Sequence, residues 1–411
     1  MRILIVTQYF TPEITAAPAR LHPLAAGLAA RGYQVEVVCE VPSHPLGLIA
    51  PGYGRRFADR RRLDGFAATY VWTYATPSKR ARDRLASYAS YAASATLVAA
   101  FRRRPDVVVA SSPPLSVGAV GAAVAARHRV PWVLDVRDLW PEAAITFGEL
   151  RSSRMIELAE RLERRLYASA AAITTPTQPF REHIAARTSD PAKVFLLANG
   201  TTGEWLDAGA GEADRAAHGF PDDRFVWTYA GNLGLSQDLE TAVAAAGLLG
   251  EEFRLVIVGD GASRERLERL AAARAPAAIA FMGLLPAAET ARLMRASDAL
   301  LVPLANRTYL GKSVPIKLYD CCAIGRPIVL AAPGEPRRLA EANDLALAVD
   351  PSDPGALAAG VRRLRDDPAL RRRLAAGARA FAARNLREAG IGDFDRLLRS
   401  VAAGSAADPH V

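Results

Sequence analysis

The stretch from Val314 to Val329 constrains the fold of this chain more than any other. Pro315 suits the start of a helix, because a proline at that position gives up no hydrogen bond. The residues that follow, Ile316 to Ile324, predict a short helix that ends at Gly325. A short apolar run, Ile328 to Leu330, comes next and is typical of a buried strand. The stretch therefore predicts a helix that leads directly into a buried strand.

Lys317 and Asp320 lie three residues apart near the start of this predicted helix, so they share one of its faces. A helix N-terminus that carries a lysine is suited to an anion such as a diphosphate. An acidic residue one turn further on could accept hydrogen bonds from a sugar diol. The alternative is a solvated ion pair on the helix surface, which is the usual role of residues at this spacing.

Strand and helix patterns alternate along the chain in two successive blocks. The first block starts at the N-terminus, and the pattern restarts at Phe225 after loop-like residues 199–203. Each block has about the size of one nucleotide-binding domain. The expected strands are Arg2–Val6, Gln34–Cys39, Tyr70–Thr73, Asp106–Ala110, Trp132–Val136, Ala172–Thr175 and Val194–Leu197, then Phe225–Tyr229, Leu255–Val258, Ile279–Met282, Leu300–Val302, Ile328–Leu330 and Ala346–Val349. The predicted fold class is α/β with two parallel sheets.

The chain is basic, with 52 Lys+Arg against 43 Asp+Glu and a net charge of +9. Its basic clusters in the first block are Arg55-Arg56, Arg60–Arg62, Lys79–Arg84 and Arg102–Arg104. A basic face can bind nucleic acid or an anionic membrane, and it can also have no specific partner. The clusters lack the regularly interleaved aromatic residues of a nucleic-acid site, so we expect no nucleic-acid partner.

The cysteines and apolar segments indicate a cytoplasmic location. Cys39, Cys321 and Cys322 have neither zinc-site nor disulfide-framework spacing, and we expect no metal and no cofactor. The apolar run at the N-terminus is too short for a signal peptide. The alanine-rich apolar segments, Tyr88 to Phe101 and Leu115 to Ala126, are shorter than the ~20 residues of a membrane span.

Glycines follow three successive predicted strands of the second block, at Gly231, Gly259 and Gly283. Ligands of parallel sheets bind at the carboxyl ends of the strands, and glycines there let backbone N–H groups approach a phosphate. Each single glycine is explained equally well by a tight turn. Gly259-Asp260-Gly261 is not a full dinucleotide fingerprint, because Arg264 occupies its last position.

Polar residues also follow predicted strands of the first block. Asp135 and Asp138 come at the end of one strand, while Glu13 and Arg20 follow the first strand of the chain. They are candidates for contact with a substrate, because loops at these strand ends carry function. The alternative for the aspartates is an Arg–Asp loop network with Arg137, and for Glu13 and Arg20 it is a plain surface role.

The motifs occur in the order found in family 4 glycosyltransferases, and this resemblance covers nearly the whole chain to about Leu398. The stretch that begins at Val314 closely resembles the donor-binding signature of that family, with Asp320 in place of its glutamate. The last N-terminal motif is similar to the branch that transfers N-acetylated deoxyamino sugars such as N-acetylfucosamine. The other motifs are Gln8–Glu13, Arg31–Val35, Asp135–Glu142, Tyr229–Gly234, Val258–Gly261 and Phe281–Gly283.

The resemblance implies the GT-B architecture, with two Rossmann-like domains facing across a cleft. It implies an acceptor domain over residues 1–200, a donor domain over 201–380 and a helix over 381–402 that crosses back to the first domain. It further implies retaining transfer of a sugar from a nucleoside diphosphate donor to a glycan, lipid-linked or small-molecule acceptor. An anionic membrane surface is a further candidate partner.

The residues expected at the site follow from the same resemblance. Lys317 would meet the donor diphosphate and act in catalysis together with Asp138, and Asp320 would bind the nucleotide ribose. The further residues expected on the donor side are Gly231, Asn232, Gly259, Asp260, Gly283 and Lys312, and those expected at the acceptor are Glu13, Arg20 and Glu142.

Two positions depart from the family pattern. Lys312 stands where many members carry a first glutamate, and Asn232 and Gln237 follow the first strand of the second block, where an arginine and a lysine are common. Lys312, Lys317 and Arg307 could supply the missing charge. Two alternatives follow, namely a sugar-nucleotide epimerase or hydrolase of the same fold and a non-catalytic subunit that binds a nucleotide sugar.

Overall fold

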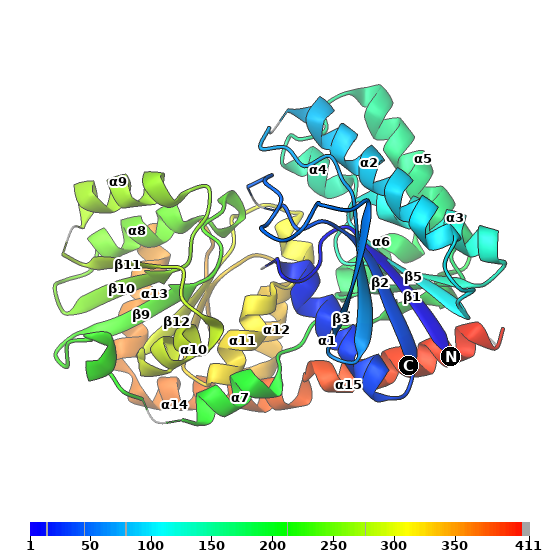
Figure 1. The fold of residues 1–411 in the computed structure, drawn as a ribbon. Helices are drawn as coiled ribbons and strands as arrows, with labels where there is room; N and C mark the ends of the chain where they lie inside the picture. Colours follow the sequence, from blue (N-terminus) through cyan, green and yellow to red (C-terminus); the bar gives the residue numbers. More distant parts are fainter. Residues whose placement is uncertain (14, 45, 79, 212, 276, 405–411) are drawn as a thin grey trace. The chain divides into compact units, whose positions relative to one another are not determined.

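The computed structural model describes residues 1–404 apart from residues 14, 45, 79, 212 and 276. The chain divides into two compact units (Figure 1). Unit 1 comprises Met1–Ala198 and the chain from Arg387 onward, and unit 2 comprises Asn199–Leu386. The sequence had placed these two boundaries after residues 200 and 380. The last helix, α15 (Arg387–Ala402), belongs to unit 1, although it follows unit 2 in the sequence.

Unit 1 is built on an eight-stranded sheet with the order β3-β4-β2-β1-β5-β6-β7-β8. All neighbouring strands are parallel except β3 and β4, which pair antiparallel. The strands are β1 (Arg2–Thr7), β2 (Gln34–Glu40), β3 (Ala58–Leu63), β4 (Phe66–Val71), β5 (Val107–Ser112), β6 (Trp132–Val136), β7 (Ala172–Thr175) and β8 (Val194–Leu196). Because a parallel sheet needs helices on both faces, its central strands are apolar almost throughout.

Helices cover both faces of this sheet (Figure 1). The helices of unit 1 besides α15 are α1 (Ala16–Ala30), α2 (Ala81–Ala100), α3 (Leu115–His128), α4 (Glu142–Thr146), α5 (Ser153–Ser169) and α6 (Gln178–Ala185). On one face, Leu21 of α1 and Phe394 of α15 pack with Ile3 and Ile5 in one core. The apolar face of α15 is therefore completed by unit 1, which explains why this helix leaves unit 2.

Strand β3 was not predicted from the sequence. Its residues Arg60 and Arg62 are exposed, and the strand lies at the edge of the sheet. Charged side chains on an edge strand discourage pairing with another chain. They also remove the apolar pattern by which buried strands are recognised. The neighbouring strand β4 was expected at Tyr70 to Thr73 and lies at Phe66–Val71, in register with the missed strand.

Unit 2 carries a six-stranded parallel sheet with the order β11-β10-β9-β12-β13-β14. Its strands are β9 (Phe225–Ala230), β10 (Phe253–Val258), β11 (Ile279–Gly283), β12 (Ala299–Pro303), β13 (Ile328–Ala331) and β14 (Leu347–Val349). Its helices are α7 (Gly203–Ala210), α8 (Leu239–Gly247), α9 (Arg264–Arg274), α10 (Ala287–Ala296), α11 (Ile316–Ile324), α12 (Glu335–Asn343), α13 (Pro354–Asp366) and α14 (Pro368–Arg384). All of the strands expected in this block are present.

The predicted helix and strand of the Val314–Val329 stretch form as α11 and β13. Gly325 ends the helix in the left-handed region with φ 68°, as a glycine after a helix commonly does. Leu318 and Cys322 of α11 are buried with Leu330 of β13 in one core. The other face of the sheet buries Trp227 with residues of α8 and α13. The core that α11 shares with β13 fixes this helix, and with it Lys317, relative to the ends of the strands.

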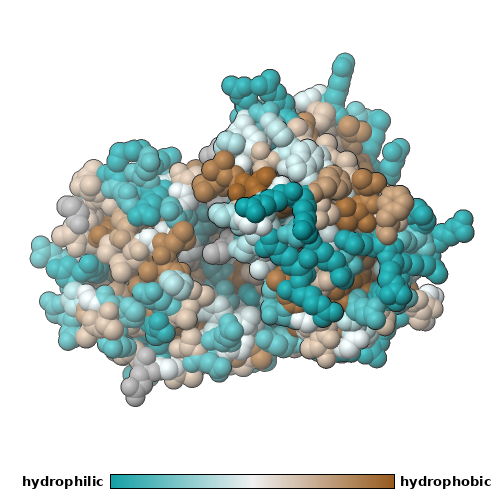
Figure 2. Space-filling model, in the orientation of Figure 1, coloured by the Kyte–Doolittle hydropathy of each residue, from teal (hydrophilic) through white to brown (hydrophobic). Residues whose placement is uncertain are grey.

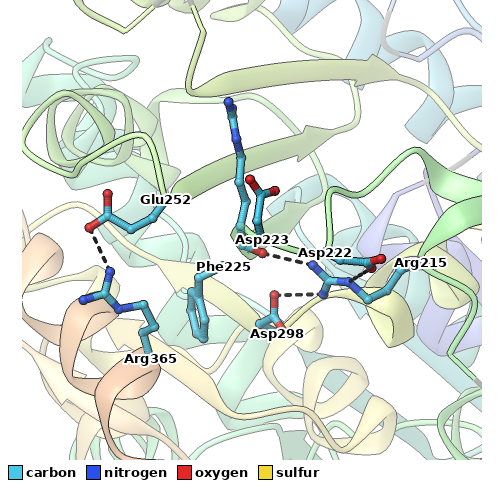
Figure 3. Close-up of a pocket in the computed structure, with 8 residues that line it drawn as sticks. Arg215, Asp222, Asp223, Phe225, Glu252, Asp298 and Arg365 are labelled. Carbon is cyan, nitrogen blue, oxygen red and sulfur yellow. Dashed lines mark hydrogen bonds and ion pairs between the residues drawn. The ribbon is translucent and has the colours of Figure 1, made fainter.

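A pocket of about 550 Å³ lies at the amino edge of the unit 2 sheet (Figure 3). Arg215 forms one side of it and ties a loop to the sheet. Its guanidinium donates to the carbonyls of Pro221 at 2.8 Å and Arg224 at 3.0 Å, and to the carboxylate of Asp298 at 2.9 Å. Asp298 in turn accepts from the backbone N–H of Val226 at 2.7 Å. This edge lies opposite to the carboxyl ends of the strands, and its charged residues stabilise the fold.

We expect Arg215→Ala to lower the free energy of unfolding by about 2 kcal/mol, because several partly buried acceptors lose their donor together. Urea unfolding followed by circular dichroism measures the change. Arg372→Ala is the matched control, since Arg372 is exposed and has no ion pair among the described residues. Equal unfolding midpoints for the two variants would contradict this role of Arg215.

Candidate active site

The carboxyl ends of β9, β10 and β11 are joined by backbone hydrogen bonds. The N–H of Gly231 donates to the carbonyl of Val258 at 2.9 Å, and the N–H of Gly259 donates to that of Gly283 at 2.7 Å. Gly231 and Gly259 both have positive φ, at 146° and 129°. A Cβ atom on Gly259 would lie 1.9 Å from the carbonyl oxygen of Gly231. Glycine is therefore required where these strand ends meet, and the turns form a compact backbone surface.

Lys317 lies directly beside this surface. It is the second residue of α11, and its Nζ donates a hydrogen bond to the hydroxyl of Tyr229 at the end of β9. The same Nζ is 3.9 Å from the centre of the Tyr229 ring. A Cβ atom on Gly231 would come within 2.7 Å of it. Lys317 and the Gly231 turn, which lie far apart in the sequence, are thus neighbours in unit 2.

Tyr229 is a candidate site residue that no sequence pattern indicated. Its hydroxyl donates to the carbonyl of Asn232 at 2.6 Å and accepts from Lys317. Burial raises the pKa of Tyr229, so it remains a neutral hydrogen-bonding group. It is the first residue of the Tyr229–Gly234 motif, but tyrosine in a strand is usually a core residue. Only its contact with Lys317 marks it as a positioning residue.

The electrostatic state of Lys317 is set by its surroundings. The side chain is half-buried, and loss of hydration lowers its pKa from 10.5 to about 7. Cys321, one turn further along α11, does not supply a counter-charge, because burial raises the pKa of its thiol to about 12. A lysine with this pKa gains much from a nearby anion. Lys317 is therefore suited to a ligand that brings negative charge.

The other predicted donor residues take different positions. Thr201 donates to the carboxylate of Asp320 at 3.0 Å, so Asp320 is tied to the start of unit 2. Asp260 is exposed and accepts from the N–H of Gly261 at 2.7 Å, while Arg264 lies 3.5 Å from its carboxylate. Lys312 ends a short 3-10 helix, Leu310–Lys312, and is half-buried.

In unit 1, Asp135 is the centre of a buried network. Its carboxylate accepts from Arg20 at 3.0 Å, Ser111 at 2.7 Å and Thr174 at 2.9 Å. Burial alone would raise the pKa of Asp135, but the charge of Arg20 and these hydrogen bonds lower it. Arg137 joins the network through Ser111 at 2.9 Å. The alternative of an Arg–Asp loop network thus describes Asp135, and Arg20, predicted at the acceptor, is tied into it.

Asp138 differs from its neighbour Asp135. It is half-buried, and burial raises its pKa from 3.8 to about 7 in spite of the charge of Arg137. Glu142, the first residue of α4, lies 3.3 Å from Nδ1 of His183 on α6. His183 was not predicted, because a single histidine far away in the sequence gives no signal. Asp138, as a carboxyl group with a pKa near neutrality, can both accept and donate a proton.

A second group of acids lies at the ends of β1 and β2. Glu13 accepts from the backbone N–H groups of Ser43 and His44, both at 2.8 Å. The side-chain amide of Gln8 donates to Glu40 at 2.8 Å. Burial, followed by the charge of Glu13, raises the pKa of Glu40 to about 8. Of these two acids, only Glu13 was predicted from the sequence, since Glu40 ends a strand whose apolar pattern gives no reason to expect a buried charge.

No group of three or more His, Cys, Asp or Glu side chains within the described part of the chain is arranged to hold a metal ion. None of the helices formed by the described residues is long and apolar enough to cross a membrane.

Solved structures with known folds superpose on this chain over nearly its whole length. The sucrose-phosphate synthase from Thermosynechococcus elongatus gives a TM-score of 0.78 at 18% identity, covering 98% of this chain and 100% of that one. Anabaena HepE, solved in complex with UDP-glucose, gives 0.70 at 16% identity, with coverages of 98% and 100%. At such identities the likeness concerns the fold. The fold is that of the GT-B glycosyltransferases.

Sequence comparisons define the family. Residues 15–200 match the glycosyl transferase 4-like domain, and residues 211–381 match the glycosyl transferases group 1 domain. The two matches together span most of the chain. The chain therefore carries two glycosyltransferase domains in succession, and the predicted fold class and enzyme class are confirmed.

Individual relatives agree with this assignment. The chain is 26% identical over 383 residues to WcaI of Escherichia coli, whose name assigns it to colanic acid biosynthesis as a glycosyl transferase. That match covers 88% of this chain and 92% of WcaI. The chain is also 28% identical over 245 residues to an alpha-D-kanosaminyltransferase of Streptomyces kanamyceticus, with coverages of 57% and 62%.

The pKa of Glu40 predicts a pH dependence of stability. The pKa is about 8 in the folded state against an ordinary value of 4.5. The folded state therefore binds more protons between these values, and its stabilisation, complete below about pH 4.5, is lost as the pH rises through about 8. Glu40→Gln should remove this loss, which is of the order of 1–3 kcal/mol.

Urea unfolding at pH 5 and pH 9 measures this difference. Glu157→Gln is the matched control, because Glu157 is an exposed residue that pairs with Arg161 on α5. If wild type and Glu40→Gln lose the same free energy of unfolding between pH 5 and pH 9, Glu40 does not hold a proton in the folded state.

Proposed function

We propose that this glycosyltransferase transfers a sugar from a nucleoside diphosphate to a hydroxyl group of an acceptor, with retention of the anomeric configuration. The observation that carries the proposal is the position of Lys317. It combines a helix N-terminus, a poorly hydrated ammonium group and a glycine-lined backbone turn in one place. This combination suits a diphosphate better than any neutral ligand.

The chemistry asks for stabilisation of the departing diphosphate. Negative charge grows on it as the glycosidic bond breaks, and a cation fixed beside it stabilises that charge without reorganisation. Lys317 is fixed by Tyr229 and would supply this charge together with the first turn of α11. The proposal requires no bound metal or cofactor. Asp320, with its carboxylate held by Thr201, would accept hydrogen bonds from the nucleotide ribose.

In unit 1, Asp138, Glu13 and Glu142 are the proposed contacts of the acceptor. Asp138 and Glu13 lie on the loops that follow β6 and β1, and Glu142 begins α4, the helix that follows β6; ligands of parallel sheets bind at these strand ends. Asp138 would accept a hydrogen bond from the attacking hydroxyl. The motif from Asp135 to Glu142 supports an N-acetylated deoxyamino sugar as the transferred group. We place the reaction in the cytoplasm, where reduced, buried cysteines such as Cys39 are ordinary.

The alternatives to sugar transfer are a sugar-nucleotide epimerase or hydrolase of the same fold and a non-catalytic subunit that binds a nucleotide sugar. The family profiles and the named relatives are glycosyltransferases, which favours transfer over epimerisation or hydrolysis. HepE was solved with UDP-glucose, which makes UDP-sugars the first donors to test. Mass spectrometry of nucleotide sugars retained by the purified protein identifies the donor. Release of free nucleoside diphosphate only when an acceptor is present then demonstrates transfer.

Lys317→Ala should lower kcat by ~10²–10³, with a smaller effect on donor binding, because the lysine interacts most strongly with the transition state. Asp320→Asn should instead raise the KM for the donor by about tenfold, since a ribose contact is equal in the ground and transition states. Steady-state kinetics with the identified donor measures both. Lys193→Ala, the same change at a lysine bound to carbonyls in unit 1, is the control. Lys317→Ala with the kcat of wild type would refute the proposed role of Lys317. Tight donor binding by wild type with no turnover on any acceptor would instead favour the non-catalytic subunit.

Donor binding should also take up protons. Lys317 has a pKa of about 7 in the free protein, and a diphosphate beside it raises that pKa again. At pH 7.5 about three quarters of a proton should be bound with each UDP-glucose molecule, falling towards zero at pH 5.5. Calorimetric titrations in two buffers of different ionisation enthalpy measure this number. Proton uptake that persists unchanged in Lys317→Met would assign it to another group.

A further inference from the structure

Unit 1 exposes a group of large apolar side chains at the carboxyl edge of its sheet. Leu46 is 70% exposed and Leu48 64%, both in the loop between β2 and β3. Phe57, just before β3, and Trp72, just after β4, are 49% and 43% exposed. We call these four residues, together with Ile49 and Tyr74, the apolar loop surface. Large apolar side chains that gather on a protein surface mark an interaction site.

These residues come from two segments that lie side by side. The N–H of Trp72 donates to the carbonyl of Phe57 at 2.8 Å, which extends the β3–β4 pairing. In the loop, Gly47 lies so close to the segment after β4 that a Cβ atom on it would be 2.0 Å from the carbonyl oxygen of Thr76. The loop is thus packed against the segment that carries Trp72 and Tyr74, and the group forms one surface.

Positive charge borders this surface. Arg55 and Arg56 are exposed in the same loop, and Arg80 is exposed at the start of α2, shortly after Tyr74. None of these three arginines forms an ion pair with a described residue. Figure 2 shows hydrophobic side chains beside hydrophilic ones on the face of unit 1 that carries β3. Lys79, which belonged to the same basic cluster in the sequence, lies outside the described residues.

The cluster Arg102–Arg104 lies away from this surface, so the basic clusters of the first block do not form a single face. It follows the far end of α2, a helix of 20 residues and about 30 Å. Arg102 pairs with Glu36 at 3.1 Å, and Arg104 donates to the carbonyls of His128 and Arg129 at the amino edge of the sheet. These arginines are engaged within the fold.

We propose that the apolar loop surface docks unit 1 on an anionic lipid bilayer, with Leu46, Leu48 and Trp72 entering the interface. Apolar and aromatic side chains are suited to the boundary between head groups and acyl chains. Arg55, Arg56 and Arg80 meet the negative head groups. The uncompensated positive charge beside the apolar residues is what favours an anionic bilayer over an apolar protein partner.

The base of this loop connects the surface to the predicted acceptor side. Ser43 and His44, which precede Leu46, donate their N–H groups to Glu13. A bilayer bound at Leu46 would therefore present a lipid-linked acceptor at the edge where Glu13 lies. This consequence rests on the proposed function, whereas docking itself does not.

Flotation with vesicles tests docking without any enzymatic assay. Wild type should bind phosphatidylcholine vesicles that contain phosphatidylglycerol at least tenfold better than vesicles of phosphatidylcholine alone, and salt should weaken that binding. The double variant Leu46→Ser/Leu48→Ser should lose binding by at least tenfold. Arg55→Glu/Arg56→Glu should lose more than about 25-fold, from roughly fivefold for each arginine. Leu158→Ser, at an exposed leucine of α5 that is 61% exposed, is the control and should bind as wild type does.

Three outcomes would overturn the proposal. The first is that wild type fails to float with anionic vesicles at low salt. The second is that the loop variants bind as well as wild type does. The third is that sedimentation shows the loop variants to be monomers where wild type is a dimer, while flotation is unchanged. Thermal melts identify variants that fail to fold. If the variants fail to fold, amide hydrogen exchange of residues 46–57 in the wild-type protein tests docking instead. Docking should slow their exchange when anionic vesicles are added, whereas an undocked loop should exchange at the same rate with and without vesicles. Loss of transfer activity with intact flotation would count against the proposed function alone.

Discussion

Parallel strand pairing is the constraint on which the rest of this structure depends. Every strand pair of unit 2, and every pair except β3–β4 in unit 1, is parallel. Both faces of each sheet must then be covered by helices, and all carboxyl ends of the strands meet at one edge. At that edge, the first turn of α11 carries Lys317 in unit 2, and the loop after β6 carries Asp138 in unit 1. The opposite edge carries structural ion pairs such as Arg215 with Asp298.

The degree to which burial of charge is compensated separates the candidate site residues from the structural network around Asp135. Asp135 is surrounded by donors, and its negative charge is stabilised. Lys317, Asp138 and Glu40 have pKa values near neutrality, at about 7, 7 and 8, because burial is only partly compensated within the folded chain. Groups whose charged form is poorly stabilised occur preferentially at functional sites. The proposal for Lys317 rests on this imbalance together with its place beside the Gly231 turn.

The sequence was most informative where one pattern dominates. Apolar runs identified the central strands, and Pro315 and Gly325 located α11 closely, since proline and glycine each fix a backbone conformation. It was least informative at β3, whose arginines hide the strand pattern, and at single polar residues. Tyr229 and Glu40 both stand in apolar strands. Nothing in their local sequence separates a core tyrosine from one that holds a lysine, or an ordinary acid from a buried one.

The sequence by itself determined the two-block α/β organisation, the family and the residue type at each strand end, because these depend on local periodicity and on the order of motifs. Only the tertiary structure decided which of those residues meet. Lys317 and Tyr229 are 88 residues apart, and Arg20 and Asp135 are 115 apart. Their contacts, and the pKa values that follow, depend on the packing of distant segments and on the loss of water between them. No local pattern contains that information.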